Sequence, residues 1–243
     1  MSVEILAVPI DAEVVEGDDL AGMIHRAAPE LRDGDVLVVT QKVVSKAEGR
    51  IVELADVEPS PRAIELADAH SDPRFVEVVL RESRRLVRQR GPLLIMETHH
   101  GIVCANAGVD RSNAPRPDTV VLLPRDPDAS ARAVRLRIQE LTGLRIAVIV
   151  ADTMGRPLRD GIVGTAIGSC GMSPLRHLAG QVDPNNLRLA TTVVAVADEL
   201  AAAADLVFGK LDRVPAVVIR GYEVSGDGSA TSLIRDPSLD LFV

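Results

Sequence analysis

Apolar residues recur along the chain in two spacings, and short runs of them predict strands where polar residues or glycine bound the run. Such runs occur from the beginning of the chain to near its end. Two of them flank His99-His100-Gly101, which predicts a tight turn between neighbouring strands. The expected strands are 3–8, a strand from 36 that turns polar near 41, two strands within 93–108, and 119–124, 145–153, 188–197 and 215–221.

Helices are predicted where apolar residues return every three or four positions behind a residue that can cap the first turn. The clearest example is 126–143, in which Val134 and Ile138 share one stripe and a glycine closes the segment. The stretch 72–91 is predicted to be helical throughout and to end at Gly91. The other expected helices are 18–28, 60–70 and 198–209.

Strands and helices follow one another over the whole length without strict alternation, which favours a mixed-sheet α+β or α/β fold over a simple Rossmann arrangement. At 243 residues, 47% of them hydrophobic, the chain can bury a sizeable core. We expect one domain over 1–243. The helical stretch 60–90 could separate two lobes, although no feature marks their boundary.

The charge balance bears on the partners of the protein. The chain has 27 basic and 35 acidic residues, a net charge of −8, and only 2% aromatic residues. Nucleic-acid binders show a basic face and often stacking aromatics, so nucleic acid is not expected as a partner. An anionic small molecule that arrives with metal ions stays compatible with this balance, because local basic clusters remain.

The chain shows no sign of secretion or membrane insertion. It begins without the basic leader and apolar segment of a signal peptide, and no apolar run approaches the roughly 20 residues that span a bilayer. Cys104 and Cys170 form no CxxC pair, which favours neither a disulfide scaffold nor a zinc site. A cytoplasmic location without membrane association is expected.

The common nucleotide and nucleophile motifs are absent. The sequence contains no GxxxxGK followed by Ser or Thr, no GxGxxG and no GxSxG. A P-loop or Rossmann site is therefore not expected, and any phosphate cradle must be of a less common kind.

Polar clusters at predicted strand ends are the remaining candidates for chemistry. The first contains Lys42, Lys46 and Arg50, whose charges suit phosphate oxygens. Taken alone, a solvated basic edge is the more common explanation of such a cluster.

The second cluster, NAGVDRSN, places Asp110 between Asn106 and Asn113. Taken alone, it is better explained by an Asx-type turn, in which these side chains bond their own backbone. The third cluster has Asp152 and Thr153 at the end of a buried run, and their oxygens suit Mg²⁺ or Mn²⁺. An aspartate that caps the next turn explains it equally well.

Several stretches join these clusters into one resemblance. They are EGDDL, DVLVV followed by VSKAEGR, CANAGVDRSN, ELTG, ADTMGR, GIVGTAIG, VADELAAAADL and VPAVVIRG. In these stretches, and in their order up to about Gly228, the sequence resembles the coenzyme F420 gamma-glutamyl ligase family (coenzyme F420-0:L-glutamate ligase). The segment FGKLDRVP is most similar to the N-terminal ligase domain of the two-domain actinobacterial form.

The resemblance implies a two-lobed, mixed α/β body with a mixed, largely antiparallel sheet, unlike the ATP-grasp ligases. It implies an enzyme that uses GTP to attach L-glutamate to the lactyl carboxylate of coenzyme F420-0, and then a second glutamate through a gamma-linked amide. It also implies two divalent ions, Mg²⁺ or Mn²⁺, with K⁺ as a further cation, and a homodimer. No flavin is expected, because the sequence has no counterpart of the flavin-binding half of the actinobacterial form.

The resemblance also implies roles for individual residues. Asp110 and Asp152 would hold one divalent ion, Thr153 would contact the second, and Asp110, Asp152 and Lys46 would be catalytic. The expected nucleotide-binding residues are Asp11, Ala12, Glu13, Val14, Gln41, Lys42, Lys46 and Asn113.

Two segments depart from the family pattern. The family often has an apolar sequence of the Leu-Pro-Leu-Ile type where this chain has Asp11–Val14, so only backbone contacts of that loop are expected to be kept. In FGKLDRVP, Asp212 is the only acid, which leaves open the remaining ligand of the second metal ion.

The chemistry that the resemblance implies needs charge neutralisation more than a protein nucleophile. The γ-phosphoryl group of GTP would pass to the lactyl carboxylate, and the glutamate amine would attack the resulting acyl phosphate. The strand ends that carry Asp110 and Asp152 would then converge on one metal site. Two alternatives stay open: a non-catalytic nucleotide-binding domain of this fold, and a ligase for a different carboxylate acceptor.

Overall fold

The computed structural model describes residues 2–28, 30–67, 71–112, 114–209 and 212–239. Its main sheet has five strands in the order β1-β12-β2-β8-β9. Only β2 and β8 run parallel, and the other neighbours are antiparallel, so the sheet is mixed and largely antiparallel, as expected. The strands are β1 (Glu4–Val8), β12 (Ala216–Arg220), β2 (Val36–Thr40), β8 (Ala147–Arg156) and β9 (Arg159–Cys170).

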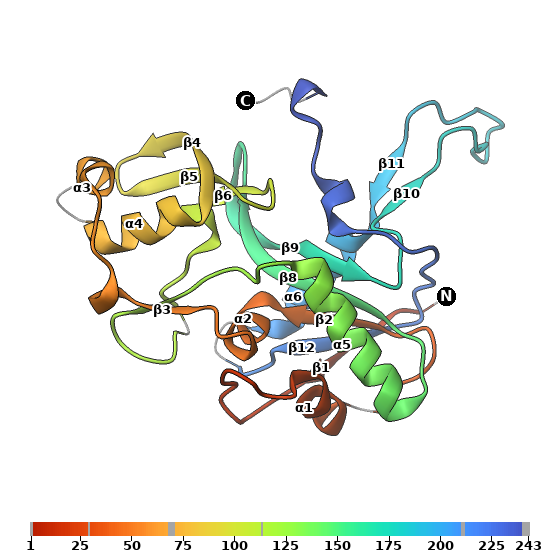
Figure 1. Cartoon of the computed structure of the whole chain (residues 1–243). Coiled ribbons are helices and arrows are strands. Elements are labelled where there is room, and N and C mark those ends of the chain that lie inside the picture. The colour runs from red at the N-terminus through yellow and green to blue at the C-terminus, as the bar shows by residue number, and fades with distance from the viewer. Residues whose placement is uncertain (1, 29, 68–70, 113, 210–211, 240–243) are drawn as a thin grey trace.

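Helices cover both faces of the main sheet (Figure 1). Along β8, Val148 and Val150 pack into a core shared with α1 and α5, whereas Ile149 and Ala151 pack into a second core against α6. A strand that is buried on both faces is apolar at successive positions, which explains the uninterrupted run that leads to Asp152. These helices are α1 (Leu20–Ala27), α5 (Pro127–Thr142) and α6 (Val196–Phe208).

A smaller antiparallel sheet of three strands lies beside the main sheet (Figure 1). One of its faces packs with two short helices around a third apolar core, which contains Val79, Leu94 and Met96. Its elements are α3 (Pro61–Leu66), α4 (Pro73–Arg81), β4 (Ser83–Arg90), β5 (Leu93–Thr98) and β6 (Val103–Ala105).

Short elements complete the described part of the chain. A pair of strands, β3 (Ile51–Glu53) and β7 (Thr119–Val121), lies between the two sheets in sequence, and a second pair is β10 (Leu175–His177) and β11 (Val193–Ala195). The link between β10 and β11 extends away from the main sheet (Figure 1). The 3-10 turns are η1 (Leu54–Asp56), η2 (Asn106–Gly108), η3 (Ala230–Leu233) and η4 (Pro237–Leu239). Among the described helices, none combines the length and the apolar character that crossing a membrane requires.

The helix predicted over 126–143 is confirmed, together with its caps. Asp126 accepts a hydrogen bond from the Ala129 amide at 2.9 Å, and Gly143 ends the helix with a φ of 77°. The tight turn at residues 99–101 is also confirmed, between β5 and β6. Cys104 is buried, as expected of a small apolar residue.

The helix predicted over 72–91 is wrong beyond Arg81, where α4 ends. Residues Ser83–Arg90 form β4 and pair with β5, and Leu86 faces Met96 across that pair. Leu86 lies at a helical distance from Val79, but the neighbouring strand offers its backbone hydrogen bonds and a buried partner. Tertiary pairing has therefore overridden the local periodicity.

Two elements at the candidate site were not predicted. The polar stretch after β2 is a helix, α2 (Gln41–Ala47), rather than the end of a strand. The stretch after β8 returns as β9, and the pair forms a long hairpin at one edge of the main sheet. Both elements shape the cavity described below.

Candidate functional site

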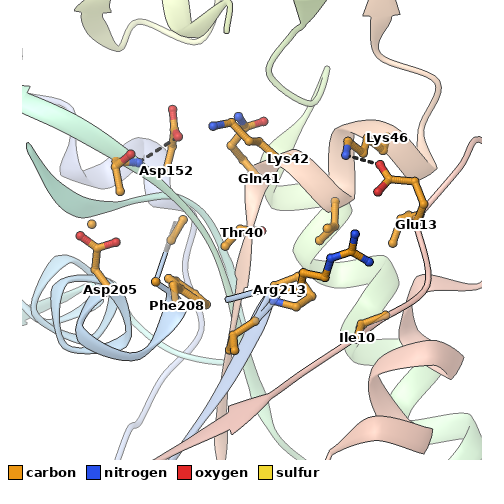
Figure 2. Close-up of a pocket in the computed structure, with 18 of the residues that line it drawn as sticks. Ile10, Glu13, Thr40, Gln41, Lys42, Lys46, Asp152, Asp205, Phe208 and Arg213 are labelled. Carbon is orange, nitrogen blue, oxygen red and sulfur yellow. Dashed lines mark hydrogen bonds and ion pairs between the residues drawn. The ribbon is translucent and has the colours of Figure 1, made fainter. Parts of the chain in front are cut away.

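A cavity of about 570 Å³ opens at the ends of β2 and β8, on the side of the sheet where α2 begins and α6 ends. Its walls come from five parts of the chain: the loop 10–14, residues 40–46, residues 114–115, the β8–β9 hairpin, and 205–215. Figure 2 shows the Asp152 and Asp205 carboxylates on one side of this cavity and the Lys46–Glu13 pair on the other.

The structure brings together most of the residues that the sequence singled out. The loop Asp11–Val14 lines the cavity, and so do Gln41, Lys42, Lys46, Asp152 and Thr153. Asp110 is not among the lining residues, but it is bonded to Lys42, which is. Asn113 lies outside the described residues.

Gln41 is the first residue of α2 and is only 1% exposed. Its Oε1 atom accepts a hydrogen bond from Ser45 Oγ at 2.9 Å. Its Nε2 atom is buried and has no hydrogen-bond partner in the described part of the chain. An unsatisfied buried donor costs free energy, and one that lines a cavity indicates a position prepared for an acceptor on a ligand.

Lys46 lies one turn further along α2 and pairs with the early loop. Its Nζ atom is 2.5 Å from Glu13 Oε1, and its side chain is 9% exposed against 57% for that of Glu13. The sequence predicted only backbone contacts from this loop. The structure adds a role for the Glu13 side chain, because its carboxylate balances a nearly buried ammonium group.

Asp110 is held by two neighbours. Lys42 Nζ lies 2.6 Å from its Oδ2 atom, and the backbone amide of Ser112 donates to its Oδ1 atom at 2.7 Å. Burial disfavours the ionised form, but the bonds from Lys42 and Ser112 outweigh it, so the pKa of Asp110 lies below its ordinary value. The Asx turn that explains this stretch locally is thus present, and the ion pair with Lys42 adds to it.

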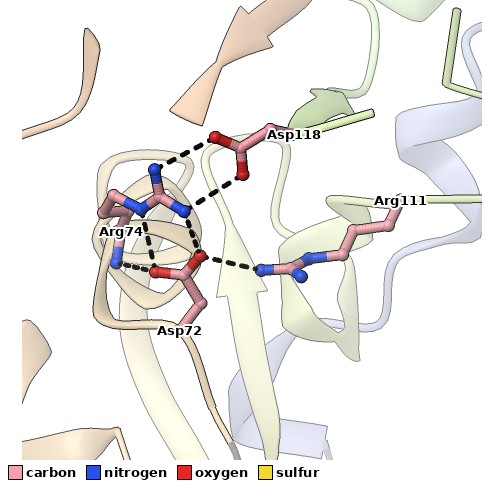
Figure 3. A network of polar contacts seen from close by, with 4 residues as sticks. All are labelled: Asp72, Arg74, Arg111 and Asp118. Atoms are coloured by element: carbon pink, nitrogen blue, oxygen red, sulfur yellow. Dashed lines mark hydrogen bonds and ion pairs between the residues drawn. The ribbon is translucent and has the colours of Figure 1, made fainter. Parts of the chain in front are cut away.

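A charged network anchors the loop that follows Asp110 (Figure 3). Arg74, in α4, bonds Asp72 at 2.8 Å and Asp118 at 3.0 Å, and Arg111 lies 3.4 Å from Asp72. The hydrogen bond from Arg74 lowers the pKa of the Asp72 carboxyl. Both ends of the loop 111–118 are therefore tied to the start of α4.

Asp152 stands at the end of the buried part of β8, and its Oδ1 atom accepts the Thr153 amide at 2.8 Å. Its charge acts on Cys104: burial first, and then the nearby Asp152 carboxylate, raise the pKa of that thiol to about 12. Cys104 belongs to β6, the strand that leads into the Asp110 segment. The two predicted strand ends are thus neighbours in the fold.

Asp205 and Arg213 also line the cavity but were not predicted as site residues. Arg213 donates to the backbone oxygen of Asp11 at 2.8 Å and so fixes the early loop. Asp205 lies on the stripe of α6 that includes Ala201 and Phe208 and faces the sheet. An acid on such a stripe was a signal in the sequence that this position differs from the rest of the helix.

The donors at the end of β8 suit a hard divalent cation, because carboxylates and a hydroxyl are the ligands that Mg²⁺ and Mn²⁺ prefer. Among the described residues, no three His, Cys, Asp or Glu side chains are grouped so that they could hold a metal ion. Mg²⁺ is usually bound by one or two carboxylates together with water and substrate phosphates. The residues present therefore fit an ion that arrives with a nucleotide.

Comparison with known proteins places this mixed α+β chain in a class of ligases. Residues 10–221 match the family model described as F420-0:Gamma-glutamyl ligase. The chain therefore belongs to the F420-0:gamma-glutamyl ligase family, as its motifs indicated.

Similar curated relatives share this assignment. The chain is 47% identical to a protein of Methanopyrus kandleri, over 97% of this chain and 95% of the relative. It is 45% identical to one of Methanothermobacter thermautotrophicus, over 100% and 99%, and 44% identical to one of Archaeoglobus fulgidus, over 99% and 96%. Each of these relatives is named coenzyme F420:L-glutamate ligase.

Proposed function

We propose that this protein is a GTP-dependent ligase that joins L-glutamate to the lactyl carboxylate of coenzyme F420-0, in the biosynthesis of coenzyme F420. Relatives named as ligases for coenzyme F420 and L-glutamate match the chain almost end to end, which supports the reaction class. The observation that carries the proposal is the cavity, where two lysines, an unsatisfied amide and the end of β8 meet. A gamma-linked addition of a further glutamate would repeat the same chemistry on the product.

The reaction proceeds in two steps. An oxygen of the lactyl carboxylate attacks the γ-phosphorus of GTP, the bond from that phosphorus to the bridging oxygen breaks, and GDP leaves. The glutamate amine then attacks the acyl carbon, phosphate leaves, and the nitrogen loses its proton to form the amide. Both steps depend on placing the reactants and neutralising phosphate charge.

The basic residues of α2 are placed for the nucleotide. Lys46 and Lys42 would contact phosphate oxygens, and the free Nε2 donor of Gln41 would bond one of them. Each ammonium group has three donors, so each lysine can bind a phosphate and keep its present carboxylate partner. The loop Asp11–Val14 would enclose the nucleotide through its backbone.

The acidic residues are assigned to cations. Asp110 and Asp152 would hold one Mg²⁺ or Mn²⁺, and Thr153 would contact a second. Such ions, when bound, neutralise the charge that develops on the transferred phosphoryl group. K⁺ is a further cation in this proposal, without an assigned ligand.

The decisive experiment measures GDP release with GTP, coenzyme F420-0, L-glutamate, Mg²⁺ and K⁺, and omits each in turn. We expect release only when both acceptor and glutamate are present, and a product heavier by one or more glutamate residues in the mass spectrum. GTP binding without turnover would indicate a non-catalytic domain. Turnover with another carboxylate alone would indicate a different acceptor.

We also propose that the active form is a homodimer in the cytoplasm, as the family resemblance implies. Sedimentation equilibrium of the purified chain would measure the first, and fractionation of the producing cells would test the second.

A further inference from the structure

The end of β8 presents side chains to both faces of the main sheet. Side chains alternate along a strand, so Asp152 shares a face with Val150 and Met154, which belong to the core that includes Cys104. Thr153 shares the opposite face with Ala151, which packs into the core formed with α6. Asp152 and Thr153 therefore point to different sides of the strand.

Helix α6 makes an unusually close contact with the sheet beside Thr153. Thr153 pairs across the hairpin with Gly164 of β9. A Cβ atom at position 164 would lie 2.4 Å from the Ala201 carbonyl oxygen and 3.0 Å from Asp205 Cβ. Only glycine permits this approach, and it places Asp205 next to the cross-strand neighbour of Thr153.

Asp205 is a half-buried carboxylate that lines the cavity. It makes no hydrogen bond or ion pair with any described residue, whereas the Glu13 carboxylate across the cavity has Lys46 as its partner. Figure 2 shows Asp205 on the same side of the cavity as Asp152 and away from Lys46. A partly desolvated carboxylate in this position requires a positive partner from outside the described chain.

We propose that Asp205 and Thr153 together bind the second divalent cation, on the α6 face of β8. This cation is distinct from the one assigned to Asp110 and Asp152 on the opposite face, and the inference rests on the proposed function. Asp205 thereby supplies the acidic ligand that the segment after α6 lacks. The buried, unpartnered Nε2 atom of Gln41 in the same cavity is an independent sign that this space receives a ligand.

Cation binding is measured directly with Mn²⁺, by electron paramagnetic resonance of the free ion in the presence of GTP. We expect two Mn²⁺ per chain for the natural protein. Asp205→Asn should lose one of them, or weaken it by about tenfold or more, because a neutral amide is a poor ligand for a hard cation. Glu199→Gln removes the same charge from an exposed position of α6 and should keep both ions.

The count also separates this inference from the proposed function. If the natural protein binds two Mn²⁺ and Asp205→Asn keeps both with unchanged affinity, only the role of Asp205 is overturned. If the natural protein binds neither GTP nor Mn²⁺, the proposed function fails as well. Should Asp205→Asn instead raise the KM for L-glutamate while both ions stay bound, Asp205 holds the substrate ammonium group and the inference is wrong.

Direct coordination is tested by a second variant, which does not depend on the loss of an ion. A thiolate bound to Co²⁺ gives a charge-transfer absorption band, and soft ligands favour such metals. Asp205→Cys with Co²⁺ and GTP should show the band, whereas Glu199→Cys should not. Absence of the band in a folded Asp205→Cys protein that binds GTP would overturn the proposal.

Discussion

Lys42 and Asp110 form an ion pair of 2.6 Å between the first turn of α2 and the segment that follows β6. The pair joins a helix of the main sheet to a segment that the smaller sheet positions. Hydrogen bonds from Ser112 hold the same carboxylate from the other side. Asp110 is thereby kept ionised and fixed in orientation, as a ligand for a cation must be.

Asp152→Asn is predicted to lower the rate of glutamate ligation by about a hundredfold or more, because it removes charge where phosphate must be neutralised. The change is nearly isosteric, so the thermal unfolding temperature should stay close to that of the natural protein. Asp160→Asn, at an exposed position of the same hairpin, is the matched control. Substantial ligation by a folded Asp152→Asn protein would contradict the assignment.

Lys46→Met is predicted to reduce kcat/KM for GTP by about tenfold or more, since it removes a nearly buried positive charge from the proposed phosphate site. The partner serves as control: Glu13→Gln leaves the lysine in place and should change kcat/KM by about threefold at most. Steady-state kinetics at varied GTP concentration decides between these outcomes. Equal losses in both variants would show that the pair matters for the loop rather than for phosphate.

Gly164→Ala is predicted to lower the free energy of unfolding by about 1–3 kcal/mol, the usual cost of overpacking. The added methyl group would lie 2.4 Å from a backbone oxygen of α6, which cannot move aside as a flexible side chain can. Gly155→Ala in the same hairpin has nothing within 4 Å and should be neutral. Urea unfolding of both variants measures the difference, and equal stabilities would disprove the close contact.

The network in Figure 3 is predicted to make stability depend on pH. Because Arg74 lowers the pKa of Asp72 in the folded state, this pair stabilises the protein above the unfolded pKa of roughly 3.9. The contribution is lost as the pH falls through the lower, folded pKa. Asp72→Asn should therefore destabilise the protein at neutral pH and have little effect near the acid limit.

Urea unfolding of Asp72→Asn and the natural protein across the acid range would measure this dependence. Glu65→Gln, at an exposed position of α3, provides a control in which the difference should stay small at every pH. A stability difference for Asp72→Asn that does not shrink towards acid would contradict the role given to Arg74.

Much of this protein follows from local pattern. Asp126 and Gly143 mark both ends of α5 because capping satisfies backbone groups within a few residues of each other. The buried runs that form β2, β8 and β12 are apolar at successive positions because both faces are covered. The family motifs pointed to Asp110, Asp152 and the residues of α2, and all of these lie at or beside one cavity.

Other features depend on contacts between distant segments, which local pattern does not contain. Residues Ser83–Arg90 have helical spacing but become β4, because β5 offers them hydrogen bonds and a buried face. The pairing of Lys46 with Glu13 requires the early loop to fold back onto α2. Asp205 faces the cavity beside Thr153 only because glycine at position 164 lets α6 approach β9, and the order of strands in the sheet alone brings these segments together.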